Sequence, residues 1–306
     1  TTATDSYNTA VGFNAGTAVT TGTFNTLMGG QTGDALTDAD FNVAIGSQSL
    51  TADTKGSRSV AVGHGTLNAQ NFTTATNTYN TAVGHAAGLS VTTGVRNTIL
   101  GALAGDALQA ATDNVAVGVG ALGADTLGSK SVAIGKDALT VQNFTTATDA
   151  YNTAVGYFAG DSITTGNDNT LIGGLAGDAL TDADDNVAVG RSALGQDTLG
   201  SRTVAVGFGA LQVQNFTTAT NSYNIAMGYN AGASVTTGVQ NTLIGGLAGD
   251  ALQAATDNVA LGFEALTTET GGQNNVAIGT RALKAQVNSS GNIYNTAVGS
   301  NAGTSV

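Results

Sequence analysis

The 306-residue sequence contains no cysteine, no proline and no tryptophan, and only 5% of its residues are aromatic. Without cysteine, disulfide bonds and zinc sites built on thiolates are excluded. No run of 18 consecutive apolar residues occurs, which argues against a transmembrane helix. Hydrophobic residues reach 41% of the chain, but they are mainly Ala and Val. Any core is therefore expected to be narrow and built from small side chains.

Charged residues are also scarce, at 10% of the chain, and the formal net charge is −12. An acidic surface does not attract nucleic acid or an anionic membrane, so neither is expected as a partner. The serines have no repeated histidine partner, so no catalytic triad can be assembled from the sequence pattern. A carbohydrate-active enzyme would need paired carboxylates at one special repeat, and no repeat stands out in this way. We predict a non-enzymatic protein without a cofactor.

What the sequence contains instead is a repeat, which decides the fold class. A five-residue block occurs seventeen times, with spacings of 17, 17, 17 and 21 residues that sum to a 72-residue cycle, except that the final spacing is 20 residues. The block reads Asn, Ser or Thr, then a β-branched residue, then Ala, Leu or Ile, then a larger hydrophobic residue, then Gly. We predict one repeat domain over 1–306. Its four cycles are 7–78, 79–150, 151–222 and 223–293, followed by a partial fifth at 294–306.

The block has the alternation of a short strand, because positions two and four share one face and position three lies on the other. The Gly at position five predicts a turn with positive φ or a close approach of two backbones, and a second, looser strand is expected after it. A single rung cannot bury its apolar face, whereas stacked rungs can. These features predict an all-β parallel β-solenoid of about 17 rungs. In the first cycle the turn glycines are Gly12, Gly29, Gly46 and Gly63.

The fourth position of the block is expected to form the interior seam of the solenoid. Ala at position three would then face outward and let a second copy of the chain approach closely. In the first two cycles the predicted core residues are Val11, Met28, Ile45, Val62, Val83, Leu100, Val117 and Ile134.

The blocks "NVAIG" at Asn42 and Asn275, "SVAVG" at Ser59 and "SVAIG" at Ser131 resemble head repeats of YadA-like trimeric autotransporter adhesins. The pattern "NTAVGxxAG…TTG…NTLIGG" is similar to repeats of bacteriophage tail fibres and related bacterial surface proteins. The resemblance covers essentially the whole chain, although rungs of 17 to 21 residues are longer than those of the adhesin heads. It implies a left-handed β-roll, a homotrimer and a role in surface attachment.

Together, the repeats and the resemblance predict an extracellular fibre segment that is structural and adhesive, at a cell surface or in a virion fibre. Its expected partners are copies of itself and a cell-surface glycan or receptor. The alternative is a self-assembling extracellular fibril joined end to end, glycosylated or not. This alternative is motivated by the two ends of the sequence, which both lie within a repeat and show no polar capping segment.

Some loops are rich in aspartate, whose oxygens suit Ca²⁺. The equivalent loops of the second and fourth cycles replace "TDAD" with "QAAT", so solvated acidic turns are favoured over a calcium site. The candidate calcium ligands are Asp34, Asp38, Asp40, Asp178, Asp182 and Asp184.

The longer loop of each fourth rung contains the triplet NFT, which fits the acceptor pattern for N-glycosylation. These triplets begin at Asn71, Asn143 and Asn215. The phenylalanines of the same triplets, Phe72, Phe144 and Phe216, are expected to fold the loop back onto the solenoid.

Two other groups of side chains are expected on the surface. The only histidines, His64 and His85, directly follow a block Gly, in a column that also accepts residues as different as Phe13 and Lys136. No catalytic or metal-binding role is predicted for them. A tyrosine precedes the first block of each cycle, and these tyrosines are expected to stack as a surface ladder or to offer a platform for sugars.

Overall fold

The computed structural model describes residues 5–288 and 290–304, and these residues form strands and turns without any helix. The chain divides into two compact units, Thr1–Tyr151 and Asn152–Val306. The boundary falls at the start of the third predicted cycle, so each unit contains about two cycles.

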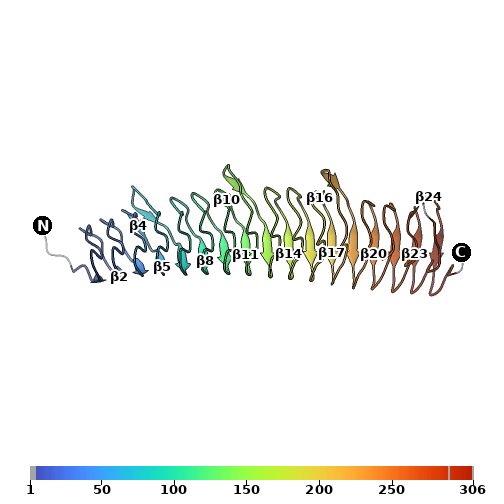
Figure 1. Ribbon diagram of the computed structural model, residues 1–306, viewed down its shortest axis with the longest axis horizontal. Helices are drawn as coiled ribbons and strands as arrows, with labels where there is room; N and C mark the ends of the chain where they lie inside the picture. Colours follow the sequence, from blue (N-terminus) through green and yellow to red (C-terminus); the bar gives the residue numbers. More distant parts are fainter. Residues whose placement is uncertain (1–4, 289, 305–306) are drawn as a thin grey trace. The chain divides into compact units, whose positions relative to one another are not determined.

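Every block forms a three-residue strand, and consecutive block strands within a unit pair in parallel (Figure 1). The first unit contains eight of them: β1 (Thr9–Val11), β2 (Thr26–Met28), β3 (Val43–Ile45), β5 (Val60–Val62), β7 (Thr81–Val83), β8 (Thr98–Leu100), β9 (Val115–Val117) and β11 (Val132–Ile134). The second contains nine: β13 (Thr153–Val155), β14 (Thr170–Ile172), β15 (Val187–Val189), β17 (Val204–Val206), β19 (Ile225–Met227), β20 (Thr242–Ile244), β21 (Val259–Leu261), β23 (Val276–Ile278) and β25 (Thr296–Val298).

Pairing joins equivalent block positions, as where Val43 pairs with Val60 and Ile45 with Val62. The longer spacing keeps the same register, since Val60 pairs with Thr81 across 21 residues. The four extra residues are therefore absorbed outside the sheet. The prediction of an all-β parallel β-solenoid with about seventeen rungs is confirmed.

Short strand pairs flank the long loop of each fourth rung. In Figure 1 the loops near β10 and β16 rise beyond the neighbouring rungs of their own units. The pairs are β4 (Gly56–Ser57) with β6 (Thr76–Asn77), β10 (Gly128–Ser129) with β12 (Thr148–Asp149), β16 (Gly200–Ser201) with β18 (Thr220–Asn221), and β22 (Gly272–Gln273) with β24 (Gly291–Asn292).

The face of the sheet that points inward is the opposite of the predicted one. Position three is buried in every block except the first, with Ala44 and Ile99 at 0% exposure, whereas Val11 is 55% and Ile45 37% exposed. The interior is too narrow for a continuous column of large side chains, so the smaller residue faces in. The predicted core is therefore wrong for Val11, Met28, Ile45, Val83, Leu100 and Ile134, which are exposed, and for Val62 and Val117, which are half-buried.

The interior alternates between an apolar and a polar half of each cycle. In the second rung the buried residues include Leu27 and Leu36, and the nearby Gly33 leaves them room, because a Cβ there would lie 2.9 Å from each leucine. In the third and fourth rungs the position of Leu36 is taken by Asp53 and Gln70, both fully buried. Leu50 and Leu67 replace the glycine in these rungs. A rung with an apolar residue at the position of Leu36 therefore has glycine at the position of Gly33, and a rung with a polar residue at the first position has leucine at the second. This accounts for the Gly, Gly, Leu, Leu sequence that recurs in every cycle.

The turn after each strand requires glycine, as predicted. Gly12 has φ 134°, and a Cβ on it would lie 2.3 Å from the carbonyl oxygen of Gly29 on the next rung. The same left-handed region is occupied by the residues two and four positions after this glycine, including the non-glycine residues Gln31 and Leu50. These repeated left-handed residues coil the chain tightly, so the expected second strand, for example over 17–24, is replaced by turns and bends.

A buried asparagine ladder runs beside each sheet. The side-chain amide of Asn25 donates to the Ala39 carbonyl at 2.8 Å, and its Oδ1 accepts the backbone N–H of Asn42 at 3.0 Å. Asn42 repeats the pattern with the Gly56 carbonyl and the Ser59 N–H. Each side chain therefore ties its own rung to the next and satisfies backbone groups that would otherwise be buried without partners.

Candidate functional surfaces

The outward face of each sheet is a continuous uncharged surface of apolar residues and threonines. Its two columns, block positions two and four, contain only Thr, Val, Ile, Leu and Met over all seventeen blocks. Position-four residues in the middle of a unit range from half-buried, as for Val117, to about two-fifths exposed, as for Leu100 at 37% and Met227 at 42%. Soluble monomers rarely expose a long apolar surface without a charge, so such a surface indicates an interaction site.

The long loops are anchored from inside by a buried carboxylate. Asp53 Oδ1 accepts the backbone N–H groups of Gly56 and Phe72, both at 3.0 Å, and its Oδ2 accepts Gln70 Nε2 at 2.5 Å. Phe72 is only 7% exposed, which confirms the prediction that it folds the loop back. Asp125 and Asp197 make the same three contacts in the next two cycles.

These anchors were not predicted from the sequence, although a conserved position within the chain's own repeats marked them: "DT" at Asp53, Asp125 and Asp197. Burial raises the pKa of Asp53 and Asp125 above its ordinary value, against the opposing effect of the glutamine and backbone hydrogen bonds. In the last cycle Glu269 replaces the aspartate, and its carboxylate accepts N–H groups of Gly272, Gln286 and Asn288. Here burial is outweighed by hydrogen bonds, and the pKa of Glu269 is lowered.

In the first unit, the residues directly before the blocks form a column of aromatic and charged side chains. Tyr7, Phe24 and Phe41 stack with ring centroids 5.1 and 5.2 Å apart. The Arg58 guanidinium follows, 5.2 Å from the Phe41 ring and 5.9 Å from the Tyr79 ring. The predicted tyrosine ladder is therefore different: tyrosines of successive cycles stack on their immediate neighbours, not on one another. A sugar platform would have to compete with these neighbours for the ring faces.

The candidate calcium ligands do not gather at one point. Among the described residues, no three or more His, Asp or Glu side chains are placed to hold one metal ion. Several of these carboxylates instead connect rungs: Asp40 Oδ1 accepts the Thr23 N–H at 2.7 Å, Asp184 Oδ1 accepts the Asn167 N–H at 2.9 Å, and Asp182 Oδ1 accepts the Thr165 hydroxyl at 2.6 Å. Asp38 is exposed and its Oδ1 accepts the Thr37 hydroxyl at 3.2 Å, whereas Asp34 Oδ1 is buried without a hydrogen-bond partner among the described residues.

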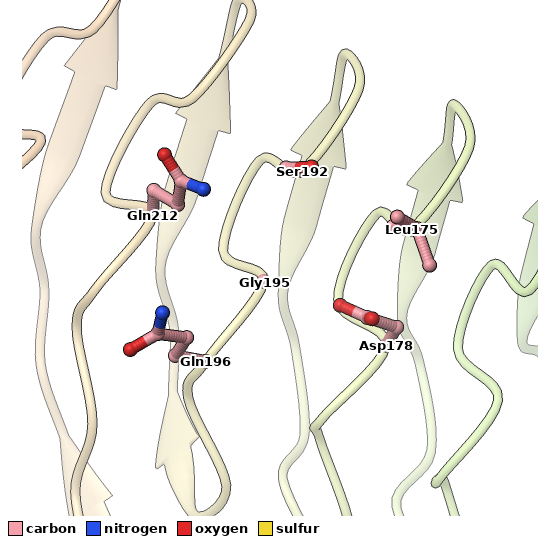
Figure 2. Close-up of a pocket in the computed structure, with 6 residues that line it drawn as sticks. All are labelled: Leu175, Asp178, Ser192, Gly195, Gln196 and Gln212. Carbon is pink, nitrogen blue, oxygen red and sulfur yellow. The ribbon is translucent and has the colours of Figure 1, made fainter.

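Asp178 lies in a small polar cavity of the second unit. The cavity has a volume of about 250 Å³ and is lined by Leu175, Asp178, Ser192, Gly195, Gln196 and Gln212. Figure 2 shows these residues on three neighbouring rungs, with Gly195 between the side chains of Asp178 and Gln212. Burial, aided by the charge of Asp161, raises the pKa of Asp178.

The cavity exists because Gly195 has no side chain. The equivalent residue of the fourth cycle is Thr267, whose hydroxyl donates to Asp250, the equivalent of Asp178. A Cβ on Gly195 would lie 3.4 Å from Asp178 Oδ1. A carboxylate, two primary amides and a hydroxyl around one cavity suit a ligand rich in hydroxyl groups.

The glycosylation candidates are accessible. Asn71, Asn143 and Asn215 are exposed, and each side-chain oxygen accepts a threonine hydroxyl, from Thr126 at 3.0 Å in the case of Asn143. The amide nitrogens point to no partner within the described residues, so modification at these three sites stays a prediction.

The two histidines lie side by side, which the sequence interpretation missed. His64 and His85 follow the paired strands β5 and β7, and their rings stack at 5.4 Å with an interplanar angle of 10°. The signal was present, because they follow the glycines of consecutive blocks. Both are exposed, as predicted.

Comparisons with known proteins do not add a family. No protein-family model matches the chain. A search of curated proteins also finds no match. In the part of the chain that the structure describes, there is no helix able to cross a membrane. The candidate functions therefore depend on the surfaces described above.

Proposed function

We propose that the protein is a non-enzymatic extracellular fibre segment, both structural and adhesive, whose copies associate through the outward faces of their sheets. The observation that supports this proposal is the uncharged surface of apolar residues and threonines formed by block positions two and four. A repeated surface of this kind can match the same surface of another copy along its length, because the rung spacing of the two is identical.

The area is sufficient for a stable contact. A three-residue strand is about 10 Å long and successive strands lie about 4.8 Å apart, so the seventeen block strands present roughly 800 Å². One partner in a typical specific interface contributes about the same area. The resemblance of the blocks to trimeric adhesin heads favours three copies over two.

Sedimentation equilibrium of the full chain tests the assembly. We expect three times the mass of one chain, and one-chain mass for a variant with Val62→Asp, Val117→Asp and Val206→Asp, which places charges on the outward face. Thr74→Asp, on an exposed long loop, adds a charge elsewhere and should leave the mass unchanged. A wild-type chain that sediments as a monomer at micromolar concentration contradicts the proposal. Filaments that lengthen with concentration would support the end-to-end alternative instead.

We place the adhesive contact at the cavity around Asp178, with a cell-surface glycan as the ligand class. Binding to a panel of immobilised glycans is the measurement. Gly195→Thr introduces the side chain that the fourth cycle has at Thr267, and should abolish binding while the trimer remains. Gly123→Thr makes the same change in the first unit, outside the cavity, and should have no effect. Equal binding by all three proteins would rule out this site.

A further inference from the structure

The two histidines of the chain are brought together by the register of the solenoid. Val60 pairs with Thr81 and Val62 with Val83, so the residues after Gly63 and Gly84 are neighbours. The backbone confirms the alignment, since the Ala86 N–H donates to the His64 carbonyl at 2.9 Å. The chain contains two histidines in 306 residues, and both occupy this one point of the surface.

The imidazoles are free to bind a ligand. Both are exposed, and within the described residues neither ring has a hydrogen-bond partner. Their column continues with Ser47 on one side and Ala102 on the other. These small side chains leave the rings accessible, and neither places a positive charge beside them.

We propose that His64 and His85 together chelate a divalent transition-metal ion, with Cu²⁺ bound most tightly. Neutral imidazole is the commonest protein ligand for such ions, and affinities of nitrogen sites rise along the first row to Cu²⁺. Water supplies the remaining ligands, as in an open site. This site is independent of the proposed function, because it needs only one chain.

Chelation requires the two stacked rings to change their orientation. The ring centroids lie 5.4 Å apart, whereas two nitrogens bound to one ion at about 2.0 Å are roughly 3 Å from each other. The nitrogen lone pairs lie in the ring planes, which are nearly parallel in the stack. Both rings must therefore rotate out of the stack until their lone pairs converge on one ion, which exposed side chains can do by rotating about their own bonds. Binding holds two neighbouring rungs together and should raise the unfolding temperature, because the unfolded chain separates the two rings.

The repeat itself provides the test. Calorimetric titration of the full chain with Cu²⁺, and then with Ni²⁺ and Zn²⁺, should show a single site with Cu²⁺ bound most tightly. Electron paramagnetic resonance of the Cu²⁺ complex should report two equivalent nitrogens. His64→Ala or His85→Ala should weaken binding by more than about tenfold, since even groups that only orient a ligand typically contribute that much.

Two double variants test whether metal binding requires two histidines on adjacent rungs or only two histidines anywhere in the column. Ala102 is the equivalent residue on the rung after His85, because the Leu103 N–H donates to the His85 carbonyl as Ala86 does to His64. His64→Ala with Ala102→His keeps two imidazoles on adjacent rungs and should restore the affinity. His85→Ala with Ala102→His leaves them two rungs apart, about 9.6 Å, and should not.

Several results would overturn the proposal. Unchanged affinity in either single variant would show that the ion binds elsewhere. Equal affinity in the two double variants would show that pairing is irrelevant. Circular dichroism of each variant checks that the solenoid is retained, which is expected because His64 and His85 are exposed and Ala102 is only half-buried.

Discussion

The two faces of the same three-residue strand differ in which residues they bury. In β17, Ala205 faces inward and is 0% exposed, whereas Val204 and Val206 on either side face outward and are half-buried. The larger side chains therefore lie outside. In a globular domain the reverse arrangement would be expected, because burial of large apolar groups drives folding.

The difference follows from the width of the rung. A rung of 17 residues closes around only a few side chains, and these are already provided by positions such as Leu194, Leu211 and Leu180. Alanine in the sheet leaves room for them. The outward valines are then available for contacts between chains, which connects the packing of one chain to its proposed assembly.

The largest expected effect comes from a charge on the inward face. Ala205→Asp places a carboxylate between Ala188 and Ala226, its register partners, with no group to neutralise it. We expect a loss of at least about 3 kcal/mol in the free energy of unfolding. Thermal unfolding followed by circular dichroism measures it.

The matched variant on the outward face is Val206→Asp. It should change the stability of the isolated chain by less than about 1 kcal/mol, while lowering the melting temperature of an assembled sample in a concentration-dependent way. If both variants destabilised the chain equally at all concentrations, the assignment of inner and outer faces would be wrong.

A smaller loss is expected from the asparagine ladder. Asn186 donates to the Gly200 carbonyl and accepts the Thr203 N–H, both at 2.9 Å, and is fully buried. Asn186→Ala leaves two buried backbone groups without partners and should cost about 2 to 4 kcal/mol in urea unfolding. Asn167→Ala, at a half-buried position whose side chain makes no hydrogen bond within the described residues, should cost less than about 0.5 kcal/mol. Similar losses of unfolding free energy in both variants would show that the asparagine ladder does not stabilise the fold.

Structural features that depend on the spacing of the repeats could be predicted from the sequence. The prediction was wrong where one sequence pattern fits two structural arrangements. Repeats of 17 residues determine parallel register, so the solenoid, the turn at Gly12 and the buried Phe72 could be predicted. Alternation at positions two, three and four distinguishes the two faces of the strand, but it does not determine which face points into the solenoid. The larger side chain of Val62 led to the wrong prediction that position four faces inward. The Asp53 anchor and the stacking of His64 on His85 required comparison of neighbouring rungs, because each depends on contacts between residues about 20 positions apart.

The polar half of the interior predicts a difference in pH dependence. Burial raises the pKa of Asp125 in the folded chain. A carboxyl with a raised folded pKa stabilises the fold below its unfolded pKa, and this stability is lost as pH rises through the folded value. Relative to Asp125→Asn, the wild type should therefore gain stability as the pH falls from neutral to about pH 4.

The last cycle provides the control for that measurement. The pKa of Glu269 is lowered, so its contribution is present above the unfolded pKa and is lost as pH falls through the folded value. The comparison of wild type with Glu269→Gln should therefore show the opposite sign. If the stability difference between wild type and variant changed with pH in the same direction for Asp125→Asn and Glu269→Gln, the roles assigned to these carboxyls would be contradicted.

The smallest effect is expected from Val204→Thr on the outward face. Thr already occupies this column at Thr153 and Thr170 in the same unit, and both residues are β-branched and suit a strand. Stability should change by less than about 0.5 kcal/mol. The same substitution one residue further, Ala205→Thr, adds atoms and a hydroxyl to a fully buried position and should cost about 1 to 3 kcal/mol. Urea unfolding of the two variants measures the difference in the stability cost of threonine at these two neighbouring positions. A loss at Val204 equal to that at Ala205 would mean that the outward column is as closely packed as the interior.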